Sequence, residues 1–150
     1  MYILGLTTMG DGSATLIRDG EIVAAVEEER FSRIKHHVGF PYKALEYCLK
    51  EGGININDID HIGLYWKPWI LGRRIIQTLS SLPYSYKHFL YRAQRGVDQI
   101  GSYYLDMLRM KKMIQDHFGG GRFRFHYIEH HLTHAASCFY VSPFETSAIF

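Results

Sequence analysis

Three consecutive strand-like runs open the chain and constrain its fold more than any other feature. The runs 2–7, 13–18 and 21–27 are apolar and rich in β-branched residues. Asp19-Gly20 joins the second run to the third, and both residues tolerate the positive φ angles of a type I′ hairpin turn. A glycine-containing loop joins the first run to the second. The sequence therefore predicts that the chain starts as a three-stranded meander.

Helical and strand-like patterns alternate after this meander. Apolar side chains recur at helical spacing in three segments, and further short runs have strand character. The expected helices cover 41–52, 94–117 and 132–139, and the expected strands cover 60–65, 122–128 and a stretch that begins near Ser147. The order βββαβ, followed by more helix and strand, predicts an α/β fold class.

The middle of the chain differs from both ends in charge. Residues 66–112 hold nine Lys or Arg against two Asp, although the formal net charge of the whole chain is only +2. Aromatic residues are interleaved with these cations, namely Trp66, Trp69, Tyr84, Tyr86, Phe89, Tyr91, Tyr103 and Tyr104. Such a surface can stack single-stranded nucleic acid or nucleotides. A helical insertion at about 66–118, whose aromatics pack and whose cations stay solvated, is the interpretation we favour, because no nucleic-acid-binding module is recognisable.

Composition excludes several classes of protein. A chain of 150 residues that is 47% hydrophobic can form one compact domain with a real core. No apolar run approaches the ~18 residues of a membrane span. Cys48 and Cys138 stand far apart and match no disulfide scaffold, which fits a reducing compartment. We therefore expect a cytoplasmic protein with no membrane partner.

A cluster of histidines is the strongest chemical signal. In Glu129-His130-His131-Leu132-Thr133-His134, two imidazoles stand four residues apart, so His130 and His134 share one helix face. Both can then converge on one cation, and imidazole suits iron, zinc, copper or nickel. The alternative is a group of solvated or helix-capping histidines.

A second signal is the loop Gly10-Asp11-Gly12-Ser13 after the first expected strand. Its backbone N–H groups and the Ser13 hydroxyl can contact phosphate oxygens, while Asp11 can orient a metal-bound water or an acceptor hydroxyl. The same sequence is also simply a favourable turn.

The charged segment 27–37 is the third signal. Arg30, Arg33 and Lys35 can hold anionic oxygens, with Glu28 orienting an arginine through a bidentate pair. The alternative is a solvated surface run.

Four motifs follow one another in a recognisable order. They are the first loop with Asp19-Gly20, the segment 26–36, Phe40-Pro41, and the histidine motif followed by Ser142-Pro143-Phe144. Together they resemble the amino-terminal region of the O-carbamoyltransferases of nodulation-factor and antibiotic biosynthesis. The resemblance covers nearly the whole chain and is thin across 66–121.

This resemblance implies an actin-like and sugar-kinase-like (ribonuclease H-like) ATPase lobe, related to the domain of enzymes that place threonylcarbamoyl on transfer RNA. It also implies a carboxy-terminal YrdC-like domain in a longer protein, which makes carbamoyladenylate from carbamoyl phosphate and ATP. The amino-terminal domain would transfer the carbamoyl group to a hydroxyl of a small-molecule or sugar acceptor with the help of a metal, generally iron. Residues 1–150 would then be part of that domain, inactive in isolation.

The same resemblance assigns roles to individual residues. His130 and His134 match the metal histidines, and the remaining ligands would be aspartates beyond Phe150. Asp11 is the candidate to orient or deprotonate the acceptor hydroxyl, and Lys35 to contact the adenylate. The candidates for substrate or nucleotide binding are Gly12, Ser13, Glu28, Arg30 and His131. The chain departs from the family at Gly10, where a histidine is usual.

Two other functions stay open at this point. One is a phosphotransferase or ATPase of the same fold, although such enzymes use Mg²⁺, which imidazole suits poorly. The other is a non-enzymatic metal-binding or nucleic-acid-binding module. We expect a small-molecule acceptor rather than nucleic acid as the partner. The sequence leaves open whether the protein forms a homodimer.

Overall fold

The computed structural model describes residues 1–8, 10–80, 86–87, 90 and 103–148. The chain divides into two compact units, one made of Met1–Lys67 with Gly120–Phe150 and the other of Pro68–Gly119. The elements of the first unit are β1 (Tyr2–Thr7), β2 (Ser13–Arg18), β3 (Glu21–Glu27), α1 (Glu29–Ser32), α2 (Tyr42–Gly52), the 3₁₀ turn η1 (Ile56–Asp58), β4 (His61–Leu64), β5 (Arg124–Tyr127) and α6 (His130–Phe139). Those of the second unit are α3 (Ile70–Ser80) and α5 (Tyr103–Phe118).

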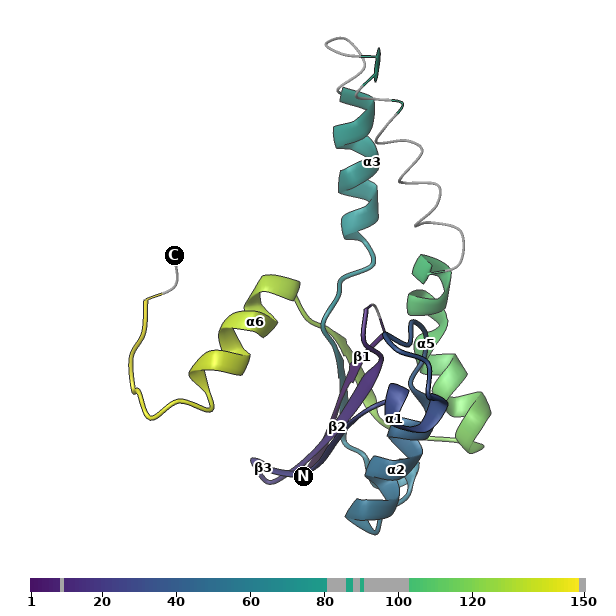
Figure 1. Ribbon diagram of the computed structural model, residues 1–150, viewed down its shortest axis with the longest axis vertical. Coiled ribbons are helices and arrows are strands. Elements are labelled where there is room, and N and C mark those ends of the chain that lie inside the picture. The colour runs from purple at the N-terminus through teal and green to yellow at the C-terminus, as the bar shows by residue number, and fades with distance from the viewer. Residues whose placement is uncertain (9, 81–85, 88–89, 91–102, 149–150) are drawn as a thin grey trace. The chain divides into compact units, whose positions relative to one another are not determined.

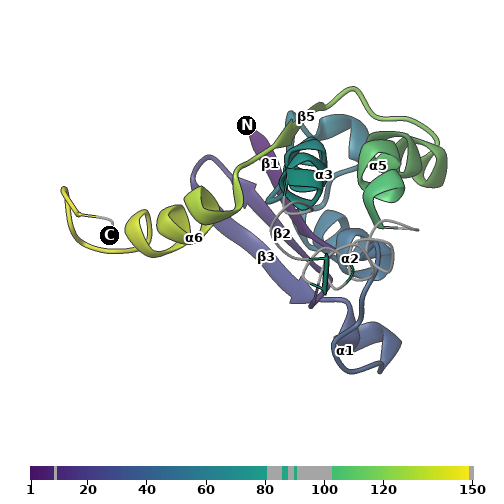
Figure 2. The same cartoon turned by 90° about the horizontal axis from the view of Figure 1, so that it is seen from above.

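The first unit is built on a five-stranded mixed sheet in the order β3-β2-β1-β4-β5. The first three strands pair antiparallel, whereas β1 with β4 and β4 with β5 pair parallel. Figure 1 shows the sheet nearly edge-on, and Figure 2 shows β1, β2 and β3 side by side. The parallel neighbours β4 and β5 end at the same edge of the sheet, and this edge carries the histidine motif.

The predicted opening meander is confirmed. All three strands have the expected bounds, and Asp19 and Gly20 have φ angles of 53° and 92°, as a type I′ turn requires. The Arg18–Glu21 pairing closes the hairpin. A register shift follows at Leu16/Ile17, a β-bulge that the sequence pattern did not indicate.

The core of this unit lies between the sheet and α2, which packs against β2 and β3. Alternate residues of β1, β2 and β4 are in register on one face of the sheet and are buried: Leu4, Leu6, Ala14, Leu16, Ile62 and Leu64. The helix contributes Ala44, Leu45, Cys48 and Leu49, whose spacing forms one face. Gly53 ends α2 in the left-handed conformation, as expected of a glycine after a helix.

Several predicted elements are confirmed with changed bounds. The expected strands 60–65 and 122–128 are reduced to β4 and β5, and the expected helix 132–139 starts two residues earlier. The expected helix 94–117 is confirmed over Tyr103–Phe118, while 94–102 lie outside the described residues. Asn55 and Asp58 form a capping box around η1, which leads into β4.

The expected strand near Ser147 is wrong over the described residues. The chain from Glu145 to Ala148 has no regular secondary structure, and residues 149–150 lie outside the description. A strand forms only where its backbone can bond to a neighbouring strand. Ser147 and Ala148 have no such pairing among the described residues.

The second unit corresponds to the predicted basic insertion, and α3 and α5 confirm its helical character. In α5, Met107, Met110 and Ile114 lie on one face and are buried. The expectation that the aromatic residues pack does not hold for Trp69 and Tyr86, which are 61% and 66% exposed. Tyr84, Phe89 and Tyr91 lie outside the described residues.

No helix among the described residues is both long and apolar enough to cross a membrane.

Candidate functional site

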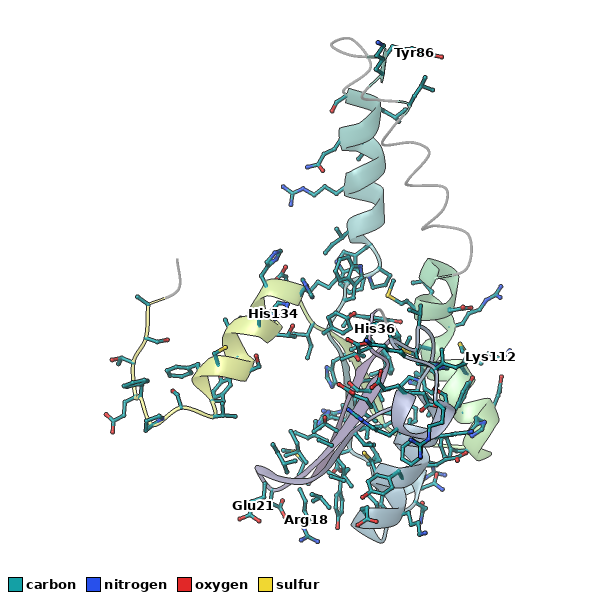
Figure 3. The ribbon with its side chains drawn as sticks, viewed as in Figure 1. Arg18, Glu21, His36, Tyr86, Lys112 and His134 are labelled. Atoms are coloured by element: carbon teal, nitrogen blue, oxygen red, sulfur yellow. The ribbon has the colours of Figure 1, made fainter. Side chains whose placement is uncertain are left out.

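The two histidines of the predicted metal site converge. His130 is the first residue of α6 and His134 lies one turn later, and their Nε2 atoms are 3.2 Å apart. Two nitrogen ligands about 2.1 Å from one cation, at the angles of tetrahedral or octahedral coordination, lie roughly 3.0–3.4 Å apart. The observed separation therefore fits two ligands of a single metal ion, and Figure 3 shows His134 on α6.

His130 also contains an unpartnered polar atom. Its Nδ1 is buried and has no hydrogen-bond partner among the described residues. Burial lowers the pKa of His130, and the neighbouring His134 and His131 lower it further. A neutral imidazole is the form that binds a metal, so this environment favours ligation.

Two aromatic rings position His130. The Tyr65 and Trp66 rings lie 5.3 and 5.1 Å from its ring, centroid to centroid. Neither residue was a candidate for this site in the sequence. A signal was present, because both directly follow β4, and β5, its parallel neighbour, leads into α6.

Glu129 fixes the start of α6. Its side chain accepts the Leu132 N–H at 2.8 Å, and its other oxygen lies 3.1 Å from His131 Nδ1. The Leu132 N–H, followed by His131, holds the pKa of Glu129 below its usual value. His131 itself is exposed, and its Nδ1 faces Glu129, while its ring lies edge-on to that of His130 with the centroids 5.5 Å apart.

The first loop lies against the charged segment that follows β3. Gly12 N–H donates to His37 O at 2.9 Å, and Glu28 N–H donates to Gly12 O at 2.7 Å. A Cβ at Gly12 would lie 3.2 Å from two backbone oxygens, so only glycine fits this approach without displacement. Ser13 bonds to the Thr7 hydroxyl at 3.0 Å. The sequence presented these segments as separate signals, and the tertiary structure joins them.

Asp11 has a partner that sequence reasoning missed. Its Oδ1 lies 2.8 Å from His36 Nδ1, and its backbone oxygen accepts the Thr7 hydroxyl. The hydrogen bond between the Asp11 carboxylate and the His36 ring raises the pKa of His36, and the negative charges of Asp11 and Glu29 raise it further. His36 N–H in turn donates to Glu29 Oε2 at 3.1 Å. The labelled His36 in Figure 3 marks this cluster.

Glu28 occupies a different environment from the one expected. It is only 4% exposed, and its Oε2 accepts the Ala44 N–H at 2.8 Å. It therefore satisfies the amino end of α2, where Pro41 supplies no side-chain cap. Arg30 pairs at the surface with Glu27 and Glu29, at 3.5 and 3.6 Å, rather than with Glu28. Lys35 is exposed next to His36.

Comparison with known proteins shows the family. The family model described as the carbamoyltransferase N-terminus matches residues 2–150. The chain belongs to this carbamoyltransferase amino-terminal family. It is 35% identical to the nodulation protein NolNO of Sinorhizobium fredii over 95% of the chain and 19% of that protein.

Two further relatives extend this result. The uncharacterized protein sll1178 of Synechocystis is 35% identical over 99% of the chain and 24% of its own length. A 19.2 kDa protein of Rhizobium etli is 38% identical over 59% of the chain and 53% of its own length. The chain therefore spans about a quarter or less of NolNO and sll1178.

Proposed function

We propose that this carbamoyltransferase-family chain forms the amino-terminal part of an O-carbamoyltransferase that transfers a carbamoyl group from carbamoyladenylate to an acceptor hydroxyl. The family match over residues 2–150 supports the carbamoyl chemistry. The 3.2 Å approach of His130 and His134 carries the metal assignment. Carbamoyladenylate is supplied by a YrdC-like domain of the longer protein, and the acceptor is a small molecule or sugar.

The donor set fits a transition metal. Two imidazole nitrogens are borderline ligands that suit iron, zinc, copper or nickel, and they leave positions for carboxylates and substrate. Within the family resemblance, iron is the metal we propose. A metal bound there supplies Lewis-acid stabilisation to an oxygen on which negative charge develops.

Residues of this chain would handle the acceptor proton and the adenylate phosphate during transfer. The acceptor oxygen forms a bond to the carbamoyl carbon, the bond from that carbon to the adenylate phosphate oxygen breaks, and AMP leaves with the electron pair. Asp11 takes or orients the hydroxyl proton, and its contact with His36 Nδ1 holds the carboxylate in place. Lys35 is exposed beside this cluster and contacts the adenylate phosphate.

A phosphotransferase of the same fold is less compatible with the first loop. That function would use backbone N–H groups of the loop to bind ATP phosphates. The Gly12 N–H is already bonded to His37 O. This loop therefore has one donor fewer for a phosphate than its sequence suggests.

Metal analysis tests the proposed centre. The longer protein, loaded with Fe²⁺ without oxygen and then desalted, should retain metal that the double variant His130→Ala/His134→Ala loses, because the histidine pair supplies only part of the ligand set. His131→Ala is the matched control, because its ring lies outside the pair, and it should retain at least half of the metal. Equal metal content in the double variant and the unchanged chain would exclude this assignment.

A further inference from the structure

A second group of potential ligands lies in the first loop and the charged segment, apart from the histidine pair of α6. Asp11, Glu29 and His36 each offer one ligand atom, and these atoms all lie within 4.8 Å of one another. The three residues come from the loop between β1 and β2, from the first residue of α1 and from the connection after α1. Neither carboxylate is buried, and the His36 ring is exposed.

Backbone hydrogen bonds hold the three side chains in this arrangement. The Gly12–His37 and Glu28–Gly12 bonds fasten the loop to the segment on both sides of α1. Gly39 N–H donates to Thr8 O at 3.1 Å and closes the same region. The ligand atoms are therefore brought together by the fold before any cation is present, which lowers the entropic cost of binding one.

We propose that Asp11, Glu29 and His36 bind one divalent first-row cation. Two carboxylate oxygens and one imidazole nitrogen form a donor set that suits Zn²⁺, Mn²⁺ or Fe²⁺. Ligands about 2.1 Å from one ion lie at most about 4.2 Å apart, so small rotations of side chains at the surface complete the site. The solvent-facing side leaves coordination positions for water or for an oxygen of an anionic ligand.

The neighbouring charges allow this site. Arg30 Nη2 lies 3.6 Å from Glu29 Oε1, but the Arg30 side chain is 68% exposed and can turn into solvent. Glu27 adds a further negative charge beside Arg30. Asp11 Oδ1 and His36 Nδ1 lie 2.8 Å apart and share a proton. A cation bound by both atoms takes the place of that proton, so no other contact of the two side chains has to break.

This inference goes beyond the proposed function, and its test needs no carbamoyl transfer. The two share Asp11, because a carboxylate that binds the cation would orient the acceptor hydroxyl rather than take its proton. The histidine pair sits on α6, whereas this site belongs to the first loop and α1. The two sites can be measured separately, because His130→Ala/His134→Ala removes only the ligands of the first. Failure of one assignment leaves the other intact.

Mn²⁺ is the probe, since it accepts oxygen-rich sites and is read directly by electron paramagnetic resonance. The chain carrying His130→Ala/His134→Ala is titrated with Mn²⁺ at pH 7.5, and we expect one bound ion per chain. Asp11→Asn and Glu29→Gln, each added singly, should weaken binding at least tenfold. Glu27→Gln is the matched control, because it removes a neighbouring carboxylate outside the cluster, and it should change affinity less than twofold.

The amide substitutions should leave the fold intact, so that a loss of Mn²⁺ binding can be attributed to the lost ligand. The amide side chains introduced by Asp11→Asn and Glu29→Gln would still offer an oxygen to His36, so the metal-free thermal midpoint should stay within about 2 °C. Absence of a bound ion, or equal weakening by Glu27→Gln and Glu29→Gln, overturns the proposal.

A change of metal preference provides a test that does not depend on loss of binding. His36→Asp replaces the imidazole nitrogen by an oxygen at a similar reach, and an aspartate tolerates the φ of 53° at this position. The ratio of Zn²⁺ to Mn²⁺ affinity should fall at least tenfold, because imidazole favours Zn²⁺. An unchanged ratio would show that His36 is not a ligand.

Discussion

Individual residues in this chain act through contacts distant in sequence. Glu28 lies 16 positions before Ala44, yet its carboxylate satisfies the N–H of that residue in the first turn of α2. Gly12 allows two backbone oxygens to approach closely, which no larger residue permits without displacement. Both residues looked like ligand-binding candidates in the sequence, and the structure gives each of them a contact that supports the fold.

Replacing Glu28 by Ala should destabilise the chain by about 1–3 kcal/mol, because a buried N–H of α2 loses its acceptor. Urea denaturation followed by circular dichroism measures this change. Glu27→Ala is the matched control, since its carboxylate is at the surface, and it should cost less than about 0.5 kcal/mol. Similar midpoints for the two variants would contradict the capping role of Glu28.

Cys48 should make stability fall at high pH. Burial raises the pKa of its thiol from 9.0 to about 11, so the folded chain holds a proton that the unfolded chain has released. The protonated thiol contributes this stability in full below pH 9. The contribution falls as pH rises from 9 towards 11, and the loss reaches about 2 kcal/mol at pH 11.

Unfolding free energies measured from about pH 8 to pH 11 should therefore decline more steeply in the unchanged chain than in Cys48→Ala. The comparison uses the slope, because the alanine also leaves a small cavity that lowers stability at every pH. Cys138 is exposed and serves as the control position. Parallel slopes for Cys48→Ala and the unchanged chain would rule out this linkage.

At the scale of elements, α2 and α6 are helices of similar length with opposite environments. Four residues of α2 are buried, whereas α6 has no buried residue. Leu132, Tyr140 and Phe144, on α6 and just after it, are 58%, 82% and 69% exposed. The stability of α6 in this chain therefore rests mainly on its own hydrogen bonds, on the Glu129 cap and on the contacts of Tyr65 and Trp66 with His130.

Hydrogen exchange should separate these two helices. Amides of α6 should exchange at least 100-fold faster than those of α2, because opening α6 exposes little additional apolar surface. Mass spectrometry of peptic peptides from 42–52 and 130–139 measures the difference, with α2 as the internal control. Comparable protection of both peptides would show that α6 is packed in solution.

At the scale of the whole molecule, the chain supplies one side of the proposed metal centre. His130 and His134 converge, while the chain spans 19% of NolNO and 24% of sll1178. Under the proposed function, adenylate formation and carbamoyl transfer belong to different parts of the longer protein. Variants within residues 1–150 should therefore affect the two reactions unequally.

In the longer protein, His130→Ala/His134→Ala should reduce carbamoyl transfer more than 100-fold and leave carbamoyladenylate formation within twofold. Pyrophosphate released from ATP in the presence of carbamoyl phosphate measures adenylate formation. Mass spectrometry of the acceptor measures transfer. Leu132→Ala provides the matched control, because this exposed side chain lies on α6 outside the histidine pair, and both rates should stay close to those of the unchanged protein. Parallel loss of both reactions would contradict the assigned role of the histidine pair.

The elements that were predictable from sequence are those governed by local rules. The meander followed from strand-like runs and from Asp19-Gly20, α2 from helical spacing, and the convergence of His130 and His134 from a separation of four residues. The bounds of β4 and β5 were less accurate, because pairing between strands decides where a short strand ends. The strand expected near Ser147 was wrong for the described residues, since a strand needs a neighbour with which to bond.

Local sequence was sufficient to predict the opening hairpin, the core face of α2 and the shared face of His130 and His134, because each depends on residues within a few positions of one another. The tertiary structure was needed to show that Asp11 lies close to His36 and Glu29, that Glu28 is buried at the amino end of α2, and that the Tyr65 and Trp66 rings contact His130. These contacts join segments that are 16 to 65 residues apart. Their formation depends on strand order and register, which residue spacing along the chain does not contain.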